Sequence, residues 1–392
     1  MKKRISLLLT ILTAFISCIE EYKISDEVST DYQSELVIQG RILSGESSTF
    51  YISRTLPFGS ENGMDYKIEN AEITIIGKNG FKSEPATYDR QKEQYTIDTM
   101  NLPANTQYAV NILLEDTVYQ SDFQELQTSP EIDAITYKEN NDGISIHVST
   151  HDKEDGSRAF MWTYEEDWEF HSDIDFVHSS GKFLYNNDIY PIVGMENPYL
   201  YCWGHQKSGN IHIYSTENLK ENAVKEHELL QIPINDIRIS YIYSILVKQW
   251  VLNNEAYNYY KTLKLYSENM GGLFSPIPTE IDGNIKCISN PSVKVKGYVI
   301  AATIVEKRIF IYENDFQNIN SEYSNCMKFT PANYSNWTSS WMEIMRAGNA
   351  VIYTTHGDLD ESSILYYKEC FDCRTVKEST KKRPDFWPNN HE

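Results

Sequence analysis

The sequence lacks a long apolar run of the kind that crosses a membrane as a helix. Residues 5–16 are almost wholly apolar, but a spanning helix needs about 20 such residues, and no second run is long enough. Basic residues are also scarce, because 35 Lys and Arg stand against 56 Asp and Glu, for a net charge of −21. Phosphate backbones are bound by clustered Lys and Arg, so this balance argues against a nucleic-acid partner.

The motifs of the commonest enzyme classes are missing as well. The sequence contains no G-x-S-x-G, no H-E-x-x-H and no Walker loop. Its densest polar cluster spans 165–178, where carboxylates and histidines could bind a divalent cation or act as acid and base. The weak metal candidates in this cluster are Glu169, His171, Asp173 and Asp175. The alternative is an acidic loop beside a strand, so we expect no catalytic residue, no cofactor and no enzyme.

The first 18 residues have the order of an export signal. Lys2, Lys3 and Arg4 precede the apolar stretch, and the small Ser17 precedes Cys18. The stretch resembles a bacterial lipoprotein signal, in which residues 1–17 are removed and Cys18 becomes the acylated first residue. The alternative is an ordinary secretory signal cut elsewhere. Acyl chains would anchor the protein to a membrane through the apolar surface that they bury.

The residues after Cys18 bear on location. Glu20 and Glu21 resemble the signal that sends lipoproteins of the Bacteroidetes group to the outer face of the outer membrane. Residues 18–34 are polar and predict a flexible tether. Removal of residues 1–17 takes three positive charges from the chain, so the net charge goes from −21 to −24. We therefore expect a lipid anchor rather than an electrostatic one.

Residues 35–128 predict a small antiparallel β-sandwich of the immunoglobulin-like or prealbumin-like type. Short strand-like runs follow one another with turn clusters between them, and Asn79-Gly80 is a favoured hairpin turn. Tyr108 is either a corner tyrosine, whose hydroxyl bonds back to the loop after Leu102, or a plain half-buried strand residue. The fold class is therefore mainly β, and Pro130 marks the boundary to the next domain.

Residues 129–392 predict a larger β-rich domain with one main helix at about 254–270. Within 254–270, apolar residues recur three or four positions apart, which places them on one helix face. Asn254 is expected to cap the helix, and the apolar face is expected to join a core rather than a partner's groove. The run "YSILVKQWVL" at 243–252 is apolar enough for a central strand.

Several separated blocks resemble a known family. In order they are "YCWG" at 201, "YSILVKQW" at 243, "GGLFSPIPTEIDGNIKCISNP" at 271, "VKGYVIAATIVEKRIFI" at 295 and "CFDCRTVKESTKKRPDFW" at 370. Together they are similar to the family called domain of unknown function 4249. The resemblance implies an outer-membrane lipoprotein that works with a TonB-dependent receptor. It implies no catalytic residue, because none is established for the family.

Five cysteines remain after Cys18, and an exported chain passes through a compartment where disulfides persist. Five is an odd number, so one thiol stays free or pairs outside the chain. We expect Cys202 to pair with Cys287, and Cys326 to pair with Cys370 or Cys373. The rival for Cys370 and Cys373 is a zinc site, because two residues separate them.

Two short motifs predict sites of modification. Asp98-Thr99-Met100 and Asp116-Thr117-Val118 resemble O-glycosylation signals, which makes Thr99 and Thr117 candidates for modification.

The favoured function is a surface lipoprotein that binds a small nutrient or serves as an accessory subunit of a TonB-dependent uptake complex. The alternative is a surface hydrolase or a divalent-metal enzyme that uses the cluster at 165–178.

Overall fold

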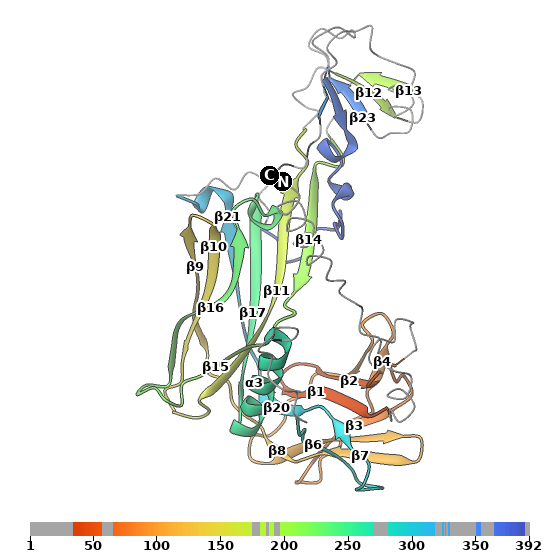
Figure 1. Cartoon of the computed structure of the whole chain (residues 1–392), viewed down its shortest axis with the longest axis vertical. Coiled ribbons are helices and arrows are strands. Elements are labelled where there is room, and N and C mark those ends of the chain that lie inside the picture. Colours follow the sequence, from red (N-terminus) through yellow and green to blue (C-terminus); the bar gives the residue numbers. More distant parts are fainter. Residues whose placement is uncertain are drawn as a thin grey trace, which may run out of the picture.

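The structure is a computed structural model, and it describes most of the chain after residue 33. The described residues are 34–56, 66–174, 181–185, 188–191, 197–269, 281–317, 324, 326, 328–329, 350–353 and 364–388. The predictions for Cys18, Glu20, Glu21, Asp175 and the segments 1–17 and 18–33 therefore lie outside the described residues. The prediction of a mainly β chain is confirmed, and two β-sandwiches and a third sheet follow one another along the molecule (Figure 1).

The first sandwich consists of two sheets that enclose one apolar core. One sheet contains β1 (Leu36–Ser44), β2 (Ser48–Arg54), β4 (Thr87–Asp89), β5 (Gln94–Ile97), β19 (Val295–Lys296) and β20 (Val299–Thr303). The other contains β3 (Glu72–Gly77), β6 (Gln107–Leu114), β7 (Thr117–Ser121), β8 (Gln124–Glu125) and β18 (Ile285–Cys287). Alternate residues such as Ile38 and Phe50 enter the core from the first sheet, and Ile73 and Val110 enter it from the second.

The local predictions for this sandwich hold. Tyr108 is fully buried, and its hydroxyl donates a hydrogen bond of 2.9 Å to the carbonyl oxygen of Pro103, as expected of a corner tyrosine. Gly80 has a φ of +86°, a left-handed conformation that glycine adopts without strain, and Gly77 closes the turn by bonding to Phe81.

The linear division at residue 128 differs from the structure. β18, β19 and β20, at 285–303, lie in the first sandwich although they follow the helix in sequence. β20 pairs with β1 in parallel register, with Ile42 opposite Ala301. A parallel partner has no tight turn that could reveal it, because it is joined through a long connection. The first sandwich therefore combines residues from two distant parts of the chain.

The second sandwich is built from long antiparallel strands. One sheet holds β9 (Ile132–Asn140), β10 (Gly143–His151) and β16 (Ala223–Pro233). The other holds β11 (Ala159–His171), β14 (Tyr201–Lys207), β15 (His212–Ser215), β17 (Ile242–Leu252) and β21 (Val305–Tyr312). The core between them includes Ile146, Trp162 and Val247. The run at 243–252 forms the central strand β17, as predicted, between β11 and β21.

The helix α3 (Asn254–Asn269) joins the two sandwiches. Its bounds match the prediction, but its cap is Asn253, whose side-chain oxygen accepts a hydrogen bond of 2.8 Å from the backbone N–H of Ala256. Ala256 and Tyr259 pack with Trp250 of β17 and with Ile300 of β20 in one apolar cluster. The apolar face of the helix is thus part of a core, as expected.

The third sheet lies at the far end of the second sandwich from the first (Figure 1). It consists of β12 (Gly181–Tyr185), β13 (Asp188–Pro191), β22 (Lys328–Phe329), β23 (Ala350–Tyr353) and β24 (Ile364–Tyr367). Short 3-10 turns occur at Ile237–Ile239, Glu313–Asp315, Lys368–Cys370 and Cys373–Thr375. None of the helices in the described part of the chain is long and apolar enough to cross a membrane.

Candidate functional site

The acidic cluster at 165–178 begins as a strand rather than a loop. Residues up to His171 belong to β11, a strand of 13 residues, so successive side chains point to opposite faces of its sheet. On one face, Glu165, Asp167 and Glu169 stand opposite residues of β14, which are Lys207, His205 and Trp203 respectively. The expectation of an acidic loop is therefore wrong for this part, because charged residues can alternate along a paired strand.

Glu166 points to the opposite face and is fully buried. Its carboxylate accepts hydrogen bonds from Arg238 at 2.9 Å and from the hydroxyl of Tyr243 at 2.8 Å. Burial raises the pKa of Glu166, and the guanidinium of Arg238 opposes that shift. Arg238 also binds Asp236 at 2.8 Å. These contacts make Glu166 part of a buried ion-pair network that sets the position of the 3-10 turn carrying Arg238.

The outer carboxylates of β11 are also engaged. Asp167 is bound by Arg308 at 3.1 Å and by His205 at 2.8 Å. Glu169 is fully buried, lies 3.3 Å from His171 and accepts a hydrogen bond of 2.7 Å from the indole N–H of Trp387. The candidates Glu169 and His171 are thus brought together, but under the C-terminal segment.

No metal site emerges from this cluster within the described residues. No group of three or more His, Cys, Asp or Glu among them could hold a metal ion. Asp173 lies beyond the end of β11, and burial raises the pKa of its carboxyl group. Asp175 and His178 are outside the described residues.

Two disulfides tie the C-terminal segment to earlier parts of the chain, one to β14 of the second sandwich and one to the residue two positions before β22. Cys202 pairs with Cys373, and Cys326 pairs with Cys370. The expected Cys202–Cys287 pair is wrong, because β18 places Cys287 in the core of the first sandwich, where its thiol is buried and free. The Cys326–Cys370 bond is one of the two alternatives expected for Cys326. Both cysteines of the proposed zinc spacing are therefore used in disulfides.

The block "RPDFWP" ends the described chain and packs on the second sandwich. Trp387 is only 4% exposed and lies beside Trp203 and Ile242. Phe386 is 44% exposed, and the guanidinium of Arg308 lies 3.6 Å from its ring centroid. This segment covers the outer face of the sheet that carries Glu169.

The strongest candidate for a binding site is a cleft of about 510 Å³ between the two sandwiches. Its first wall comes from β1, β2, β5 and the segments after β1 and β5, and its second wall comes from β11, β14, β17 and neighbouring residues. The lining residues are Arg41, Leu43, Glu46, Ser47, Thr49, Tyr51, Gln94, Thr99, Thr163, Tyr164, Glu165, Lys207, Ser208, Lys248, Trp250 and Ile304.

Lys248 lies among three carboxylates at this cleft. Its ammonium group lies 2.7 Å from Glu306, 3.8 Å from Glu165 and 4.0 Å from Glu46. Glu46 belongs to the first sandwich, and the other two carboxylates belong to the second. Burial raises the pKa of Glu46, and a hydrogen bond with Glu306 raises it further. One lysine therefore holds together carboxylates from both sides of the cleft.

Aromatic rings and hydroxyl groups supply the rest of the lining. The guanidinium of Arg41 lies 5.0 Å from the ring centroid of the fully buried Trp250. Tyr51 is 41% exposed and donates its hydroxyl hydrogen to Gln94 at 2.7 Å. A partly exposed aromatic ring beside fixed hydrogen-bonding groups suits a small polar ligand with an apolar side.

The sequence did not predict this cleft. Its walls are more than 100 positions apart in sequence, as Arg41 and Lys248 are, so no local motif could identify it. One signal was present, because Lys248 is the single charged residue of the central strand β17. A charge at such a position needs a partner, and that requirement predicts the carboxylates around it.

The two glycosylation candidates lie in different places. Thr99 is exposed at the rim of the cleft, with its hydroxyl 3.3 Å from that of Ser47. Thr117 begins β7 and is half-buried.

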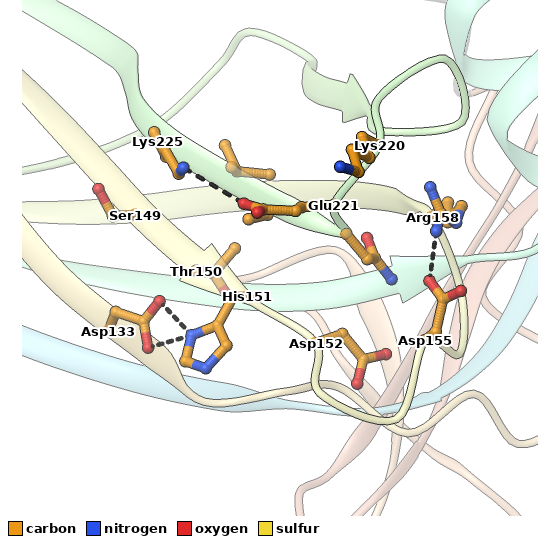
Figure 2. Close-up of a pocket in the computed structure, with 13 residues that line it drawn as sticks. Asp133, Ser149, Thr150, His151, Asp152, Asp155, Arg158, Lys220, Glu221 and Lys225 are labelled. Atoms are coloured by element: carbon orange, nitrogen blue, oxygen red, sulfur yellow. Dashed lines mark hydrogen bonds and ion pairs between the residues drawn. The ribbon is translucent and has the colours of Figure 1, made fainter.

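A second, open groove of about 490 Å³ lies on the second sandwich (Figure 2). Its polar groups pair with one another, since His151 lies 2.7 Å from Asp133 and Arg158 lies 2.6 Å from Asp155. Figure 2 shows these two pairs on opposite sides of the groove. The cleft is the better candidate, because both sandwiches build it and an exposed ring faces it.

The protein thus contains two β-sandwiches with a polar cleft at their junction. The chain belongs to the family described as Domain of unknown function (DUF4249), which matches residues 20–308. No curated protein matches it. Among solved structures, a segment of two fibronectin type-III domains from chicken tenascin is similar at 8% identity and a TM-score of 0.17. That similarity covers 57% of this chain and 93% of the tenascin segment.

Proposed function

We propose that the protein is an outer-membrane lipoprotein that faces the cell exterior and binds a small polar ligand in the cleft between its sandwiches. In this proposal it serves as an accessory subunit of a TonB-dependent uptake complex. The observation that carries the binding role is the cleft itself. It is lined by Lys248, by the exposed Tyr51 and by hydroxyl and amide groups from both sandwiches.

Support for the location comes from the sequence. Cys18 follows a basic and apolar leader and precedes two glutamates. The sequence blocks that resemble the family also support a partnership with a TonB-dependent receptor. The shared core around α3, Trp250 and Ile300 supports a preformed cleft, because it fixes the two sandwiches against each other.

The ligand role is tested with protein purified from cells, by native mass spectrometry of small molecules that remain bound. Thr49→Trp places a large ring in the cleft, so we expect it to remove the bound mass. Thr87→Trp is the matched control, since Thr87 lies in the same sheet on β4 and does not line the cleft. An equal bound mass in both variants would contradict binding in the cleft.

The partnership is tested by isolating the acylated protein from native outer membrane in mild detergent. We expect acyl chains on Cys18 and co-purification with a large barrel receptor. An unacylated N-terminus, or isolation of the protein alone, contradicts this part of the proposal.

The hydrolase alternative has less support. The carboxylates of Glu166, Asp167 and Glu169 are bound by Arg238, by Arg308 and by Trp387, so none of these three is presented to a substrate. If the alternative were right, replacing Glu169 and His171 with Ala would abolish a measured hydrolytic activity.

A further inference from the structure

Exposed apolar side chains gather at one end of the first sandwich. Nine large apolar side chains are exposed in the described residues. Five of them lie at the end where β1 begins, and they are Leu56, Tyr66, Leu113, Ile288 and Val293. Exposed apolar side chains that gather on one part of a surface mark interaction sites in soluble domains.

The strand pairings place these five residues at the same end. β2 ends there, because Arg54 pairs with Leu36 at the start of β1, and Leu56 follows. The backbone of Tyr66 is bonded to Arg54. In the second sheet, Leu113 pairs with Val118, and Val118 accepts a hydrogen bond of 2.8 Å from the backbone of Ile288.

The segment 288–294 runs across this end, because it connects β18 of one sheet to β19 of the other. β19 runs parallel to β1, and Val295 pairs with Leu36. The segment and the chain that leads into β1 therefore emerge from the same end of the sandwich. Residues 19–34, which separate Cys18 from this point, can span at most about 55 Å.

Residues between 281 and 296 line a groove of about 630 Å³ in which lysines outnumber acids. Lys286, Lys294 and Lys296 line it, and Asp282 is the single acid among the lining residues. This excess of lysine stands out in a chain with a net charge of −21.

Two of these lysines have acidic neighbours that a phosphate could replace. Lys286 lies 2.7 Å from Asp122, and Lys296 lies 3.6 Å from Glu35. The Lys286–Asp122 pair is exposed, and such ion pairs contribute little to stability, so Lys286 can turn to another anion at small cost.

We propose that this end of the first sandwich docks on a lipid surface that carries phosphate headgroups. Ile288 and Val293 enter the headgroup layer, and the three lysines contact phosphate. The inference rests on the proposed anchor at Cys18 for the orientation of the body. The anchor also keeps this surface close to the membrane, so that the effective concentration of the second contact is high and a weak contact is sufficient.

The acidic character of the whole chain does not prevent this contact. Charges separated by more than about 8 Å are largely screened at physiological ionic strength, so the nearby groups decide the interaction. The acids closest to these lysines are Asp282, Asp122 and Glu35, and Glu115 and Asp116 lie in the turn between β6 and β7. Removing one of them is expected to strengthen docking.

The test uses the full chain with Cys18→Ser, which cannot be acylated, in flotation with two kinds of vesicle. One kind is phosphatidylcholine alone, and the other contains equal parts of phosphatidylcholine and phosphatidylglycerol. We expect binding to the second kind, and at least a roughly fivefold loss for Ile288→Ser with Val293→Ser. Lys294→Glu should weaken binding to the anionic vesicles, and Asp116→Asn should strengthen it.

Leu219→Ser with Leu265→Ser is the matched control, because both leucines are exposed but lie elsewhere, between β15 and β16 and on α3. Equal losses in the two double variants would overturn the inference, as would the absence of vesicle binding by the parent chain. If millimolar inorganic phosphate released the protein completely from the vesicles, the groove lined by the three lysines would be a site for a free anion, which also overturns the inference. Thermal unfolding of each variant checks that the fold is intact.

Failure of the inference can be told from failure of the proposed function. The anchor is read by mass spectrometry of Cys18 in the native protein, and docking is read by flotation of the unacylated chain. An acylated protein whose Cys18→Ser form does not float overturns the inference alone. Loss of receptor co-purification in Ile288→Ser with Val293→Ser, without vesicle binding by the parent chain, would assign the surface to a protein partner and overturn lipid docking.

Discussion

The indole N–H of Trp387 donates a hydrogen bond of 2.7 Å to the buried carboxylate of Glu169, 218 positions earlier in the chain. This contact ties the last described segment to the C-terminal end of β11, the longest strand among the described residues. It also explains how a carboxylate can lie at zero exposure, since the indole and the nearby His171 provide its polar neighbours.

We predict that Trp387→Phe destabilises the protein. Phenylalanine fills most of the same space but cannot donate a hydrogen bond, so Glu169 loses a partner in a buried site. The expected loss is about 1–3 kcal/mol in the free energy of unfolding, measured by urea denaturation. Phe386→Leu is the control, because Phe386 is 44% exposed and its contact with Arg308 contributes less than about 1 kcal/mol. Equal losses would contradict the role given to the hydrogen bond.

The Cys202–Cys373 bond is expected to stabilise the fold strongly. It joins residues 171 positions apart, and the chain-entropy model gives about 5 kcal/mol for a loop of that length. Cys202→Ser with Cys373→Ser should therefore lower the unfolding midpoint more than Cys326→Ser with Cys370→Ser, which opens a loop of 44 positions. Peptide mapping of the unreduced protein should find Cys287 as the free thiol. A peptide that links Cys202 to Cys287 would contradict the structure.

Local sequence signals predicted the local parts of this fold. The helix at 254–269 was visible because its apolar residues recur at helical spacing, and the corner at Tyr108 was visible because it depends on a neighbouring loop. The strands at 295–303 look like any other strands, and nothing in their residues tells which sheet they join. Their place depends on parallel pairing with β1 across more than 250 positions of sequence.

The candidate sites were harder to predict for the same reason. The cluster at 165–171 was found by composition, but the cations that neutralise it, Arg238 and Arg308, come from elsewhere in the chain. The sequence predicts the wrong partner, Cys287, for Cys202, because disulfide pairing cannot be deduced from the spacing of cysteines alone. The cleft needed both sandwiches in place before Lys248 could meet Glu46.

Because of His212, we predict that the free energy of unfolding falls on acidification. Burial, together with the nearby Lys264 and His227, lowers the pKa of this half-buried imidazole to about 4. The unfolded chain, with an ordinary pKa near 6.5, binds more protons between about pH 4 and 6.5, so stability falls as pH falls through that window. Because the ring is only partly buried, we expect a loss of about 1 kcal/mol between pH 6.5 and 5.

The check is urea denaturation at several pH values. His212→Phe removes the titrating group beside Tyr164, whose ring centroid is 5.3 Å away, so its stability should vary less with pH. His151→Phe is the control, because His151 is exposed beside Asp133 on the other sheet. An unchanged pH dependence in His212→Phe would show that other groups cause the acid effect.

Lys248→Met tests the charge arrangement of the cleft. The substitution leaves Glu46, Glu165 and Glu306 facing one another without the ammonium group that lies 2.7–4.0 Å from all three. Stability should fall by about 1–3 kcal/mol, and the loss should shrink in high salt, because salt screens the repulsion among the carboxylates. Lys207→Met is the matched control, since Lys207 is 66% exposed and lies 3.8 Å from Glu165 alone. Its expected effect is below about 1 kcal/mol. If the two variants lose equal stability at low salt, Lys248 does not hold the cleft together.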